Sequence, residues 1–266
     1  MLIVGERLNS TARSVAAAIA ARDLAFMQQA AQAQVAAGAG YLDLNAAAGM
    51  AREPEDLVWL VEVVQDCVQV PLCIDSPNPA ALAAGLAACR QPAMVNSTTA
   101  EPERAAVVIP LAARHGARLV ALTMDDAGMP TTAQGRLQIA QRLVALAGEA
   151  GIQPEHLYID PLVRPVGAEA DQGQAFLEGI GAIREALPRV HLICGLSNVS
   201  YGLPGRKLLN RTFLAMAMAR GLDAAIVDPL DGQLMATVYA AAALLGQDEF
   251  CLQYLGAHRA GRLETA

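Results

Sequence analysis

The stretch YLDLNAAAGMAREPEDLVWLVEVVQDCVQVPLCID, residues 41–75, has the pattern of a strand, a helix and a second strand. Residues 41–45 and 72–75 are short, mostly apolar runs of strand length. Between them, apolar residues recur at helical spacing over 55–68, and Pro54 stands at the helix start, a position that proline favours. A unit of this kind predicts neighbouring parallel strands joined by a covering helix.

The same alternation recurs along the whole chain. The next helix is expected over Pro79–Cys89, with Asn78 as its N-cap, and glycines such as Gly38, Gly116 and Gly151 stand where helices should end. Eight strands is the number that closes a (β/α)8 barrel, so we expect one TIM barrel domain over residues 1–266. The predicted strands are Leu2–Glu6, Tyr41–Asn45, Leu72–Asp75, Ala93–Asn96, Arg118–Met124, Leu157–Asp160, His191–Ser197 and Ala224–Asp228.

Composition argues against several classes of protein. The chain is 54% apolar and 17% charged with a net charge of −7, and its nineteen basic residues, of which Lys207 is the one lysine, form no run that would follow a nucleic-acid backbone. No apolar stretch reaches the length of a membrane span, and the N-terminus reads as a strand and not as a signal peptide. The five cysteines lack C-x-x-C spacing and are interpreted as reduced thiols. We therefore expect a cytoplasmic protein with neither nucleic acid nor membrane as a partner.

The predicted strands end on polar residues. The active site of such a barrel is built at the carboxyl ends of its strands, and these ends lack histidine, cysteine and lysine, which disfavours a metal-dependent hydrolase and a Schiff-base aldolase. Carboxylates and amides suit the N–H-rich edge of a planar ring such as a pterin, with purines and flavins as alternatives. The strand-end residues are Glu6, Asp43, Asn45, Asp75, Asn96, Asp125, Asp160, Ser197, Asn198 and Asp228.

Several of these residues also have a purely structural interpretation. Asp75 and Asp160 lie beside prolines and would each suit a turn after a strand. Asn96 would serve as a helix cap, and Asp43 as a buried hydrogen-bonding group. The set as a whole favours a binding site more strongly than any single member does.

The motifs that contain these residues resemble the methyltetrahydrofolate:corrinoid protein methyltransferases, which are related to the folate domain of cobalamin-dependent methionine synthase. The resemblance runs nearly end to end, and its most specific parts are the last two motifs below. It implies a TIM barrel of the pterin-binding type. The motifs are GERLN (5–9), LDLN (42–45), CIDS (73–76), MVNST (94–98), YIDPL (158–162), GLSNVS (195–200) and NRTFLAMAM (210–218).

The resemblance implies a role for each matching residue. Asp75, Asn96 and Asp160 would hydrogen-bond the pterin ring, Asn198 would lie beside N5, the methyl-bearing nitrogen, and Arg206 would lie along the benzoyl part of the folate. It further implies a homodimer, methyltetrahydrofolate or tetrahydrofolate as substrate, and a separate corrinoid or corrinoid/iron–sulfur protein that carries the cobalt. No metal site in the chain itself is expected.

Two other specific functions stay open on the sequence alone, as does a barrel of unrelated function, because this fold hosts many chemistries. Dihydropteroate synthase uses a similar barrel and pterin site, but it needs a strand-end lysine, whereas Lys207 stands at a predicted helix start. A non-catalytic folate- or corrinoid-docking subunit is the second alternative. The chain also departs from the family pattern at Arg164, where an aliphatic residue is expected, and at Tyr201, where some members carry glutamine.

Overall fold

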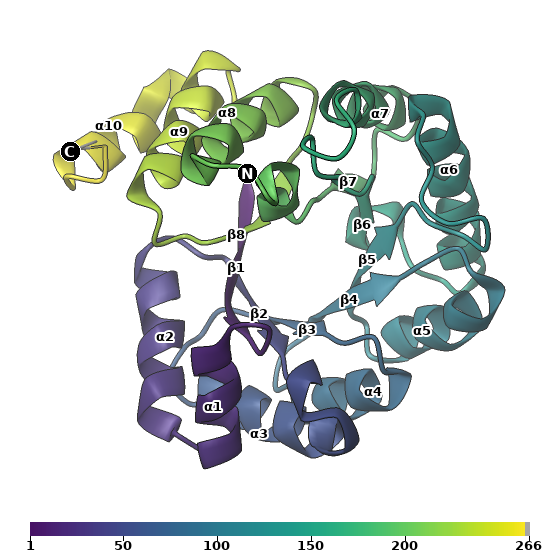
Figure 1. Cartoon of the computed structure of the whole chain (residues 1–266), viewed down its shortest axis with the longest axis vertical. Coiled ribbons are helices and arrows are strands. Elements are labelled where there is room, and N and C mark those ends of the chain that lie inside the picture. Colours follow the sequence, from purple (N-terminus) through teal and green to yellow (C-terminus); the bar gives the residue numbers. More distant parts are fainter. Residues whose placement is uncertain (264–266) are drawn as a thin grey trace.

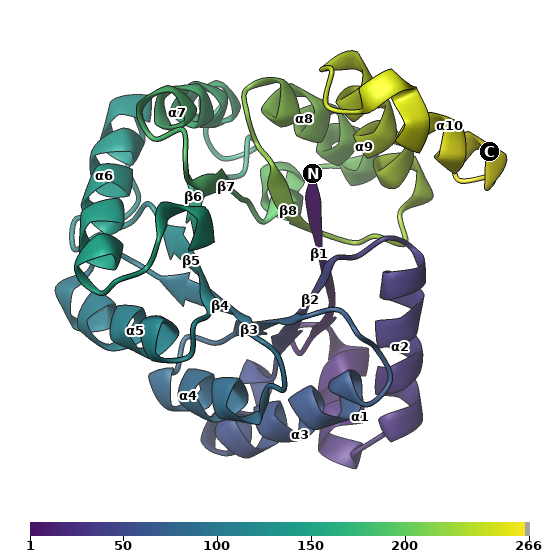
Figure 2. The same ribbon diagram turned by 180° about the vertical axis from the view of Figure 1, so that it is seen from behind.

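The computed structural model describes residues 1–263 and contains a ring of parallel strands surrounded by helices (Figure 1). The eight strands form one sheet in the order β7-β6-β5-β4-β3-β2-β1-β8, and every pairing is parallel. Seen from behind, the N-terminus and β1 lie inside the helical ring, while α10 lies at its periphery beyond α9 (Figure 2). The predicted (β/α)8 barrel is confirmed.

The elements follow the expected alternation of strand and helix. The strands are β1 (Leu2–Asn9), β2 (Tyr41–Asn45), β3 (Leu72–Asp75), β4 (Met94–Thr98), β5 (Arg118–Leu122), β6 (Leu157–Asp160), β7 (His191–Leu192) and β8 (Ala224–Val227). The helices are α1 (Arg13–Ala21), α2 (Leu24–Ala36), α3 (Glu53–Gln65), α4 (Pro79–Ala88), α5 (Pro102–Arg114), α6 (Ala133–Glu149), α7 (Gln172–Ala186), α8 (Arg206–Ala219), α9 (Gly232–Leu244) and α10 (Leu252–Arg259).

Several predicted boundaries are wrong. β1 continues three residues beyond Glu6, β4 runs on to Thr98, and β5 stops before Met124. The largest error concerns β7, which was expected to reach Ser197 but ends at Leu192. Residues 196–200 instead form a 3-10 turn, because polar residues that compete for backbone hydrogen bonds follow the apolar run. This turn carries Ser197 and Asn198 over the mouth of the barrel.

The interior of the barrel is filled by one layer of buried side chains. Each strand or its direct continuation contributes one member, so the barrel is a packed core and not a channel. The eight residues form a cluster separate from the strand–helix core: Val4, Tyr41, Cys73, Met94, Val120, Tyr158, Ile193 and Ala224. This layer limits how deeply a ligand can enter from the carboxyl ends of the strands.

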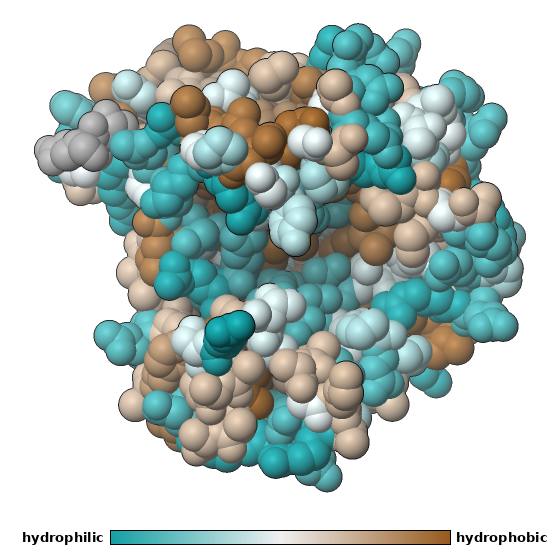
Figure 3. All heavy atoms as spheres, in the orientation of Figure 1, coloured by the Kyte–Doolittle hydropathy of each residue, from teal (hydrophilic) through white to brown (hydrophobic). Residues whose placement is uncertain are grey.

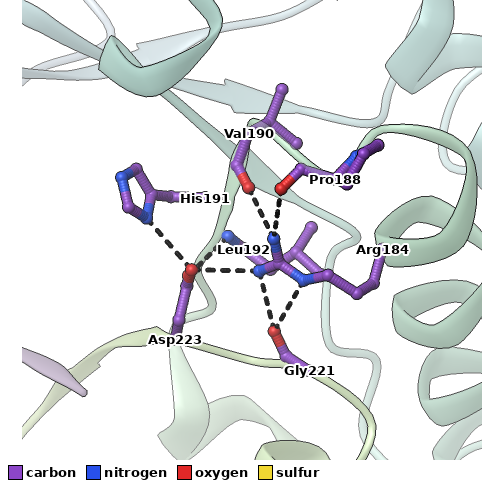
Figure 4. Close-up of polar contacts among 7 residues, drawn as sticks. All are labelled: Arg184, Pro188, Val190, His191, Leu192, Gly221 and Asp223. Atoms are coloured by element: carbon purple, nitrogen blue, oxygen red, sulfur yellow. Dashed lines mark hydrogen bonds and ion pairs between the residues drawn. The ribbon is translucent and has the colours of Figure 1, made fainter.

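Closure between β7 and β8 depends on few backbone hydrogen bonds. The Asp223 N–H donates to the Leu192 carbonyl at 3.2 Å, and the Ile226 N–H donates to the Cys194 carbonyl at 2.9 Å. The Asp223 carboxylate adds to this seam by accepting the Leu192 N–H at 2.8 Å. It also contacts His191 Nδ1 and an Arg184 nitrogen, each at 3.0 Å (Figure 4).

Arg184 completes the closing cluster from α7. Its guanidinium donates to the carbonyls of Gly221 and Val190, at 2.9 and 2.8 Å, and so ties the approaches to both strands (Figure 4). Burial alone would raise the pKa of Asp223, but the contacts with His191, the Leu192 N–H and Arg184 outweigh it, and the pKa is lowered. The ionised carboxylate is therefore the stable form in the fold.

Within residues 1–263, no helix combines the length and the apolar character needed to cross a bilayer.

Helix ends agree with the residue types at them. Asn78 caps α4 by accepting the Ala80 N–H at 3.0 Å, as predicted. Gly38, Gly116 and Gly151 follow helices with positive φ, the conformation for which glycine is favoured.

We expect Asp223→Ala to lower the free energy of unfolding at pH 7 by about 2–3 kcal/mol, because it leaves the Leu192 N–H and Arg184 without their carboxylate. Asp66→Ala is the matched control: it breaks the exposed pair with Arg90 and should cost under about 1 kcal/mol. Urea unfolding measures both. Since the pKa of Asp223 is lowered in the fold, the contribution of its carboxylate to the free energy of unfolding should disappear as the pH falls below about 4. Equal losses for the two variants would contradict this role.

Candidate functional site

A cavity of about 650 Å³ opens at the carboxyl ends of the strands. Figure 3 shows this face hollowed near its centre, with hydrophilic residues leading into the hollow. The cavity brings together residues from β1, β2, β3, β4 and the turn after β7. Of the predicted site residues, it is lined by Glu6, Asp43, Asp75, Asn96, Ser197 and Asn198.

Asp75, at the end of β3, is held by two asparagines. Its Oδ2 accepts from the side-chain nitrogen of Asn45 at 3.0 Å and from that of Asn9 at 3.4 Å. The Asn45 oxygen in turn accepts from the Ser10 hydroxyl at 2.8 Å. Asn45 thus supports the site from behind, and the Asp75 carboxylate is oriented toward the cavity that it lines.

Asp43 and Asn96 form a second pair in the cavity wall. The Asn96 side-chain nitrogen donates to Asp43 Oδ1 at 3.2 Å, which leaves the Asn96 oxygen available as an acceptor. Burial, with the adjacent negative charge of Asp75, raises the pKa of Asp43 well above its usual range. Burial also raises the pKa of Asp75 to about 6, although the bond from Asn45 and the charge of Arg104 lower it.

Asp160, at the end of β6, is buried and does not belong to the cavity lining. Its carboxyl accepts the Leu162 N–H at 2.7 Å and is also hydrogen-bonded by the backbone of Gly195. Burial raises its pKa to about 7, against those two backbone bonds. The turn role that the neighbouring proline suggested is therefore present, and Asp160 joins β6 to the segment that carries Asn198.

The turn at 196–200 is held by α8. Arg206 donates to the Ser197 carbonyl at 2.7 Å and to the Ser200 hydroxyl at 3.1 Å. The same hydroxyl donates to Asn210 at 2.6 Å. The motifs GLSNVS and NRTF thus meet in space, and their contact fixes the position of Asn198. The guanidinium of Arg206 supports this turn and is not among the groups that line the cavity.

Glu6 reaches the cavity from β1, on the side of Asn198. Ser197 donates to its carboxylate at 3.1 Å. Burial raises the pKa of Glu6, and the negative charge of Asp228 adds to this, while the bond from Ser197 and the charges of Arg206 and Arg7 lower it. Asp228 itself pairs with Arg7 at 2.8 Å at the edge of the site.

Two arginines with structural roles escaped the sequence reasoning. Arg104, on α5, donates to the carbonyls of Ser76, Pro77 and Ser97, at 3.1, 2.7 and 2.9 Å, and so ties together the segments that follow Asp75 and Asn96. Arg136, on α6, is fully buried and donates to the Pro161 carbonyl at 2.9 Å. The contacts of Arg104 with Pro77 and Ser76 span 27 and 28 positions, and that of Arg136 with Pro161 spans 25, so no local motif marks them.

The two departures from the family pattern are both accommodated near the mouth. Arg164 pairs with Glu169 at 3.1 Å in the segment after β6, and Tyr201 is 69% exposed after the 196–200 turn.

Across the described residues, no three histidine, cysteine, aspartate or glutamate side chains are grouped so as to hold a metal ion.

The raised pKa of Asp160 predicts a pH-dependent stability. The folded protein holds this proton up to about pH 7, whereas an unfolded aspartate loses it near pH 3.8. The contribution of the protonated carboxyl to the free energy of unfolding is therefore lost as the pH rises toward 8. We expect Asp160→Asn, which keeps an acceptor for the Leu162 N–H, to lose less unfolding free energy than the wild type between pH 5 and 8. Asp126→Asn, on an exposed loop, is the control. Parallel stability profiles for Asp160→Asn and the wild type would refute the assignment.

Comparisons with known proteins identify the family of the chain. Residues 5–228 match the family described as pterin binding enzyme. The chain is 39% identical to a methylcorrinoid:tetrahydrofolate methyltransferase of Eubacterium limosum over 265 residues, which cover 99% of this chain and 98% of that protein. It is 32% identical to a methionine synthase of Mycobacterium tuberculosis over 240 residues, 85% of this chain but only 20% of the larger protein.

Solved structures of dihydropteroate synthase share the fold. The enzyme of Stenotrophomonas maltophilia superposes with a TM-score of 0.68 at 21% identity and covers 93% of both chains. The Yersinia pestis enzyme with a pterine–sulfa conjugate gives a TM-score of 0.68 at 20% identity, over 92% of each chain. Sequence identity as low as this supports a shared barrel fold and no shared function. On the match over residues 5–228 and the full-length similarity to the Eubacterium protein, the chain belongs to the pterin binding enzyme family.

Proposed function

We propose that residues 1–266 act as one pterin-binding TIM-barrel domain that transfers a methyl group between N5 of methyltetrahydrofolate and the cobalt of a corrinoid protein. The observation that carries this proposal is the convergence of Asp43, Asp75 and Asn96 with Asn198 around one cavity. The full-length similarity to a methylcorrinoid:tetrahydrofolate methyltransferase supports it. Dihydropteroate synthase activity is less well supported, because Lys207 is exposed at the start of α8 and pairs loosely with Asp231 at 3.8 Å.

The cavity suits the chemistry of a pterin ring. A pterin presents adjacent N–H donors and acceptors along one edge, and the Asp75 carboxylate with the Asn96 oxygen offers acceptors on neighbouring strands. The bond between Asn45 and Asp75 holds the carboxylate before any ligand arrives, so little ordering is required on binding. In this proposal Asp160 acts indirectly, by holding the Gly195 backbone and the turn that follows it. The direct contact of Asp160 with the pterin, which the family resemblance implies, stays a prediction.

Asn198 is proposed to act at N5. A methyl group on a tertiary amine is a poor leaving group, so N5 must become more positive before the nucleophile attacks the methyl carbon. The side-chain oxygen of Asn198 accepts from a protonated N5 and stabilises that form, but an amide supplies no proton itself. The partner's cobalt supplies the nucleophile, and the role of this chain is to hold the methyl group in line with it.

The corrinoid reaches the site from a partner protein across the open mouth of the barrel. Corrinoid proteins with and without an iron–sulfur cluster are both candidates, and the same transfer assay compares them.

We place the protein in the cytoplasm, because its five cysteines are free thiols in the described structure and reduced thiols are typical of that compartment.

We further propose that the chain forms a homodimer through the surface around α10. Large apolar side chains gather there with high exposure: Leu244 is 88%, Phe250 82% and Leu252 64% exposed. A contiguous apolar surface at the periphery of the fold is typical of a protein–protein interface. The two copies would then keep their barrel mouths free for the corrinoid partner.

The first test is methyl transfer between methyltetrahydrofolate and cobalamin reduced to cobalt(I), followed by the cobalt absorption spectrum. We expect Asn198→Ala to cut turnover by about 10- to 1000-fold, the effect of losing one preorganised contact to a developing charge. Folate affinity, measured by calorimetry on the same variant, should fall much less. Unchanged turnover would reject the role of Asn198. Folate binding without transfer, even with a corrinoid protein, would favour a docking subunit.

The second test is the oligomeric state. Phe250→Glu places a charge on the proposed dimer surface, so we expect sedimentation velocity to show a dimer for the wild type and a monomer for this variant. Val107→Glu introduces the same charge at a 49% exposed apolar residue of α5, on another side of the barrel, and should stay dimeric. A monomeric wild type would refute the proposed interface.

A further inference from the structure

Asp43 is the deepest of the three polar residues that β2, β3 and β4 direct into the cavity. Each of the three stands two positions after a member of the packed interior layer, so the alternation of side chains along a strand turns it toward the cavity. The strand register pairs Asp75 with Asn96, but it pairs Asp43 with Cys73, a member of that layer. Asp43 is only 2% exposed, whereas Asp75 and Asn96 are partly exposed. Asp43 therefore lies beneath the two residues that the proposed function assigns to the pterin edge.

The side chain of Asn96 ends in an amide, which has a donor end and an acceptor end. Only the acceptor end suits a ligand edge that presents N–H groups. The amide nitrogen donates to Asp43 Oδ1 at 3.2 Å, and among the described residues Asp43 is the one hydrogen-bond partner of this side chain. Removing the Asp43 carboxyl would free the amide to rotate by half a turn about its last bond. The nitrogen would then compete with the oxygen for the position that faces the ligand.

The surroundings of Asp43 favour its neutral form. Burial, with the negative charges of Asp75 and Glu6, raises the pKa of Asp43 well above its usual range, although the hydrogen bonds from Asn96 and the Cys73 thiol oppose this. Because Oδ1 accepts from Asn96, the proton of the carboxyl lies on Oδ2. A neutral carboxyl still accepts the Asn96 N–H, and it adds no second charge beside Asp75, whose pKa is about 6. At pH 7 Asp75 can therefore remain an ionised acceptor for the ligand.

We propose that Asp43 is a positioning residue, whose carboxyl fixes the side-chain amide of Asn96 so that the amide oxygen, and not the nitrogen, faces the pterin edge. This inference rests on the proposed function, which brings the pterin to Asn96. It gives the buried hydrogen bond of Asp43 a role in ligand recognition: a fixed oxygen favours a ligand with an N–H group at this point over one with an acceptor there. Asp43 acts through Asn96 and not on the methyl group, so it should affect folate binding more than methyl transfer.

A double-mutant cycle on the affinity for methyltetrahydrofolate, measured by calorimetry at pH 7, tests whether Asp43 acts through Asn96. We expect Asp43→Ala and Asn96→Ala each to weaken binding about three- to tenfold, the effect of one hydrogen bond to the ligand. The two losses should not multiply, because both variants remove the same contact. The double variant should therefore bind within about twofold of Asn96→Ala alone. Losses that multiply would show that Asp43 acts without Asn96 and would reject the positioning role.

Two further variants separate positioning from a general effect on the fold. Asp43→Asn keeps an uncharged side chain whose oxygen accepts the Asn96 N–H, so its affinity should stay within about twofold of the wild type. Affinity as weak as that of Asp43→Ala would contradict a neutral acceptor at this position. Asp223→Ala is the matched control, because it deletes a carboxylate at the opposite end of the strands. It should lower stability and leave folate affinity unchanged. Asp43→Val, of similar size, replaces the alanine variant if circular dichroism shows a disturbed fold.

Steady-state kinetics with cobalt(I) cobalamin provide an independent readout. Asp43→Ala should raise the KM for methyltetrahydrofolate about three- to tenfold and change kcat by less than about twofold, whereas Asn198→Ala should lower kcat. A fall in kcat for Asp43→Ala at unchanged KM would overturn the inference. A wild type that binds methyltetrahydrofolate with an affinity that Asp43→Ala leaves unchanged would also overturn it, while the proposed function would stand. A wild type that binds no folate would overturn both.

Discussion

Parallel strands that close into a barrel must all end on the same side, and the arrangement of this protein depends on that constraint. It brings residues from β1, β2, β3 and β4 to one cavity although they lie up to 90 positions apart in the sequence. Closure is weakest between β7 and β8, where β7 is only two residues long. The Asp223 cluster strengthens this seam at the opposite end of the strands from the cavity. Stability and the candidate site thus occupy different ends of the same strands, as is usual in this fold.

The mouth of the barrel is organised by long side chains that bind backbone carbonyls. Arg104 joins the segments after β3 and β4, and Arg206 holds the turn after β7. Loops with few hydrogen bonds of their own are mobile, so these guanidinium contacts keep Asn96 and Asn198 in place without occupying the cavity. Burial at this end of the barrel raises the pKa values of two carboxyls, that of Asp160 to about 7 and that of Asp75 to about 6, and Arg104 opposes the shift at Asp75.

The sequence by itself determined the eight-fold alternation of strand and helix, the N-cap at Asn78 and the polar strand ends, because periodicity, capping and turn residues act over a few neighbouring positions. It also contained the motifs GLSNVS and NRTF, which resembled the right family. Only the tertiary structure decided which polar residues share the cavity, since Asn45 and Asp160 lie behind its wall and Arg206 supports a turn. The ties that Arg104 makes to Ser76 and Pro77 likewise depend on contacts between residues distant in sequence, and such contacts leave no local pattern to read.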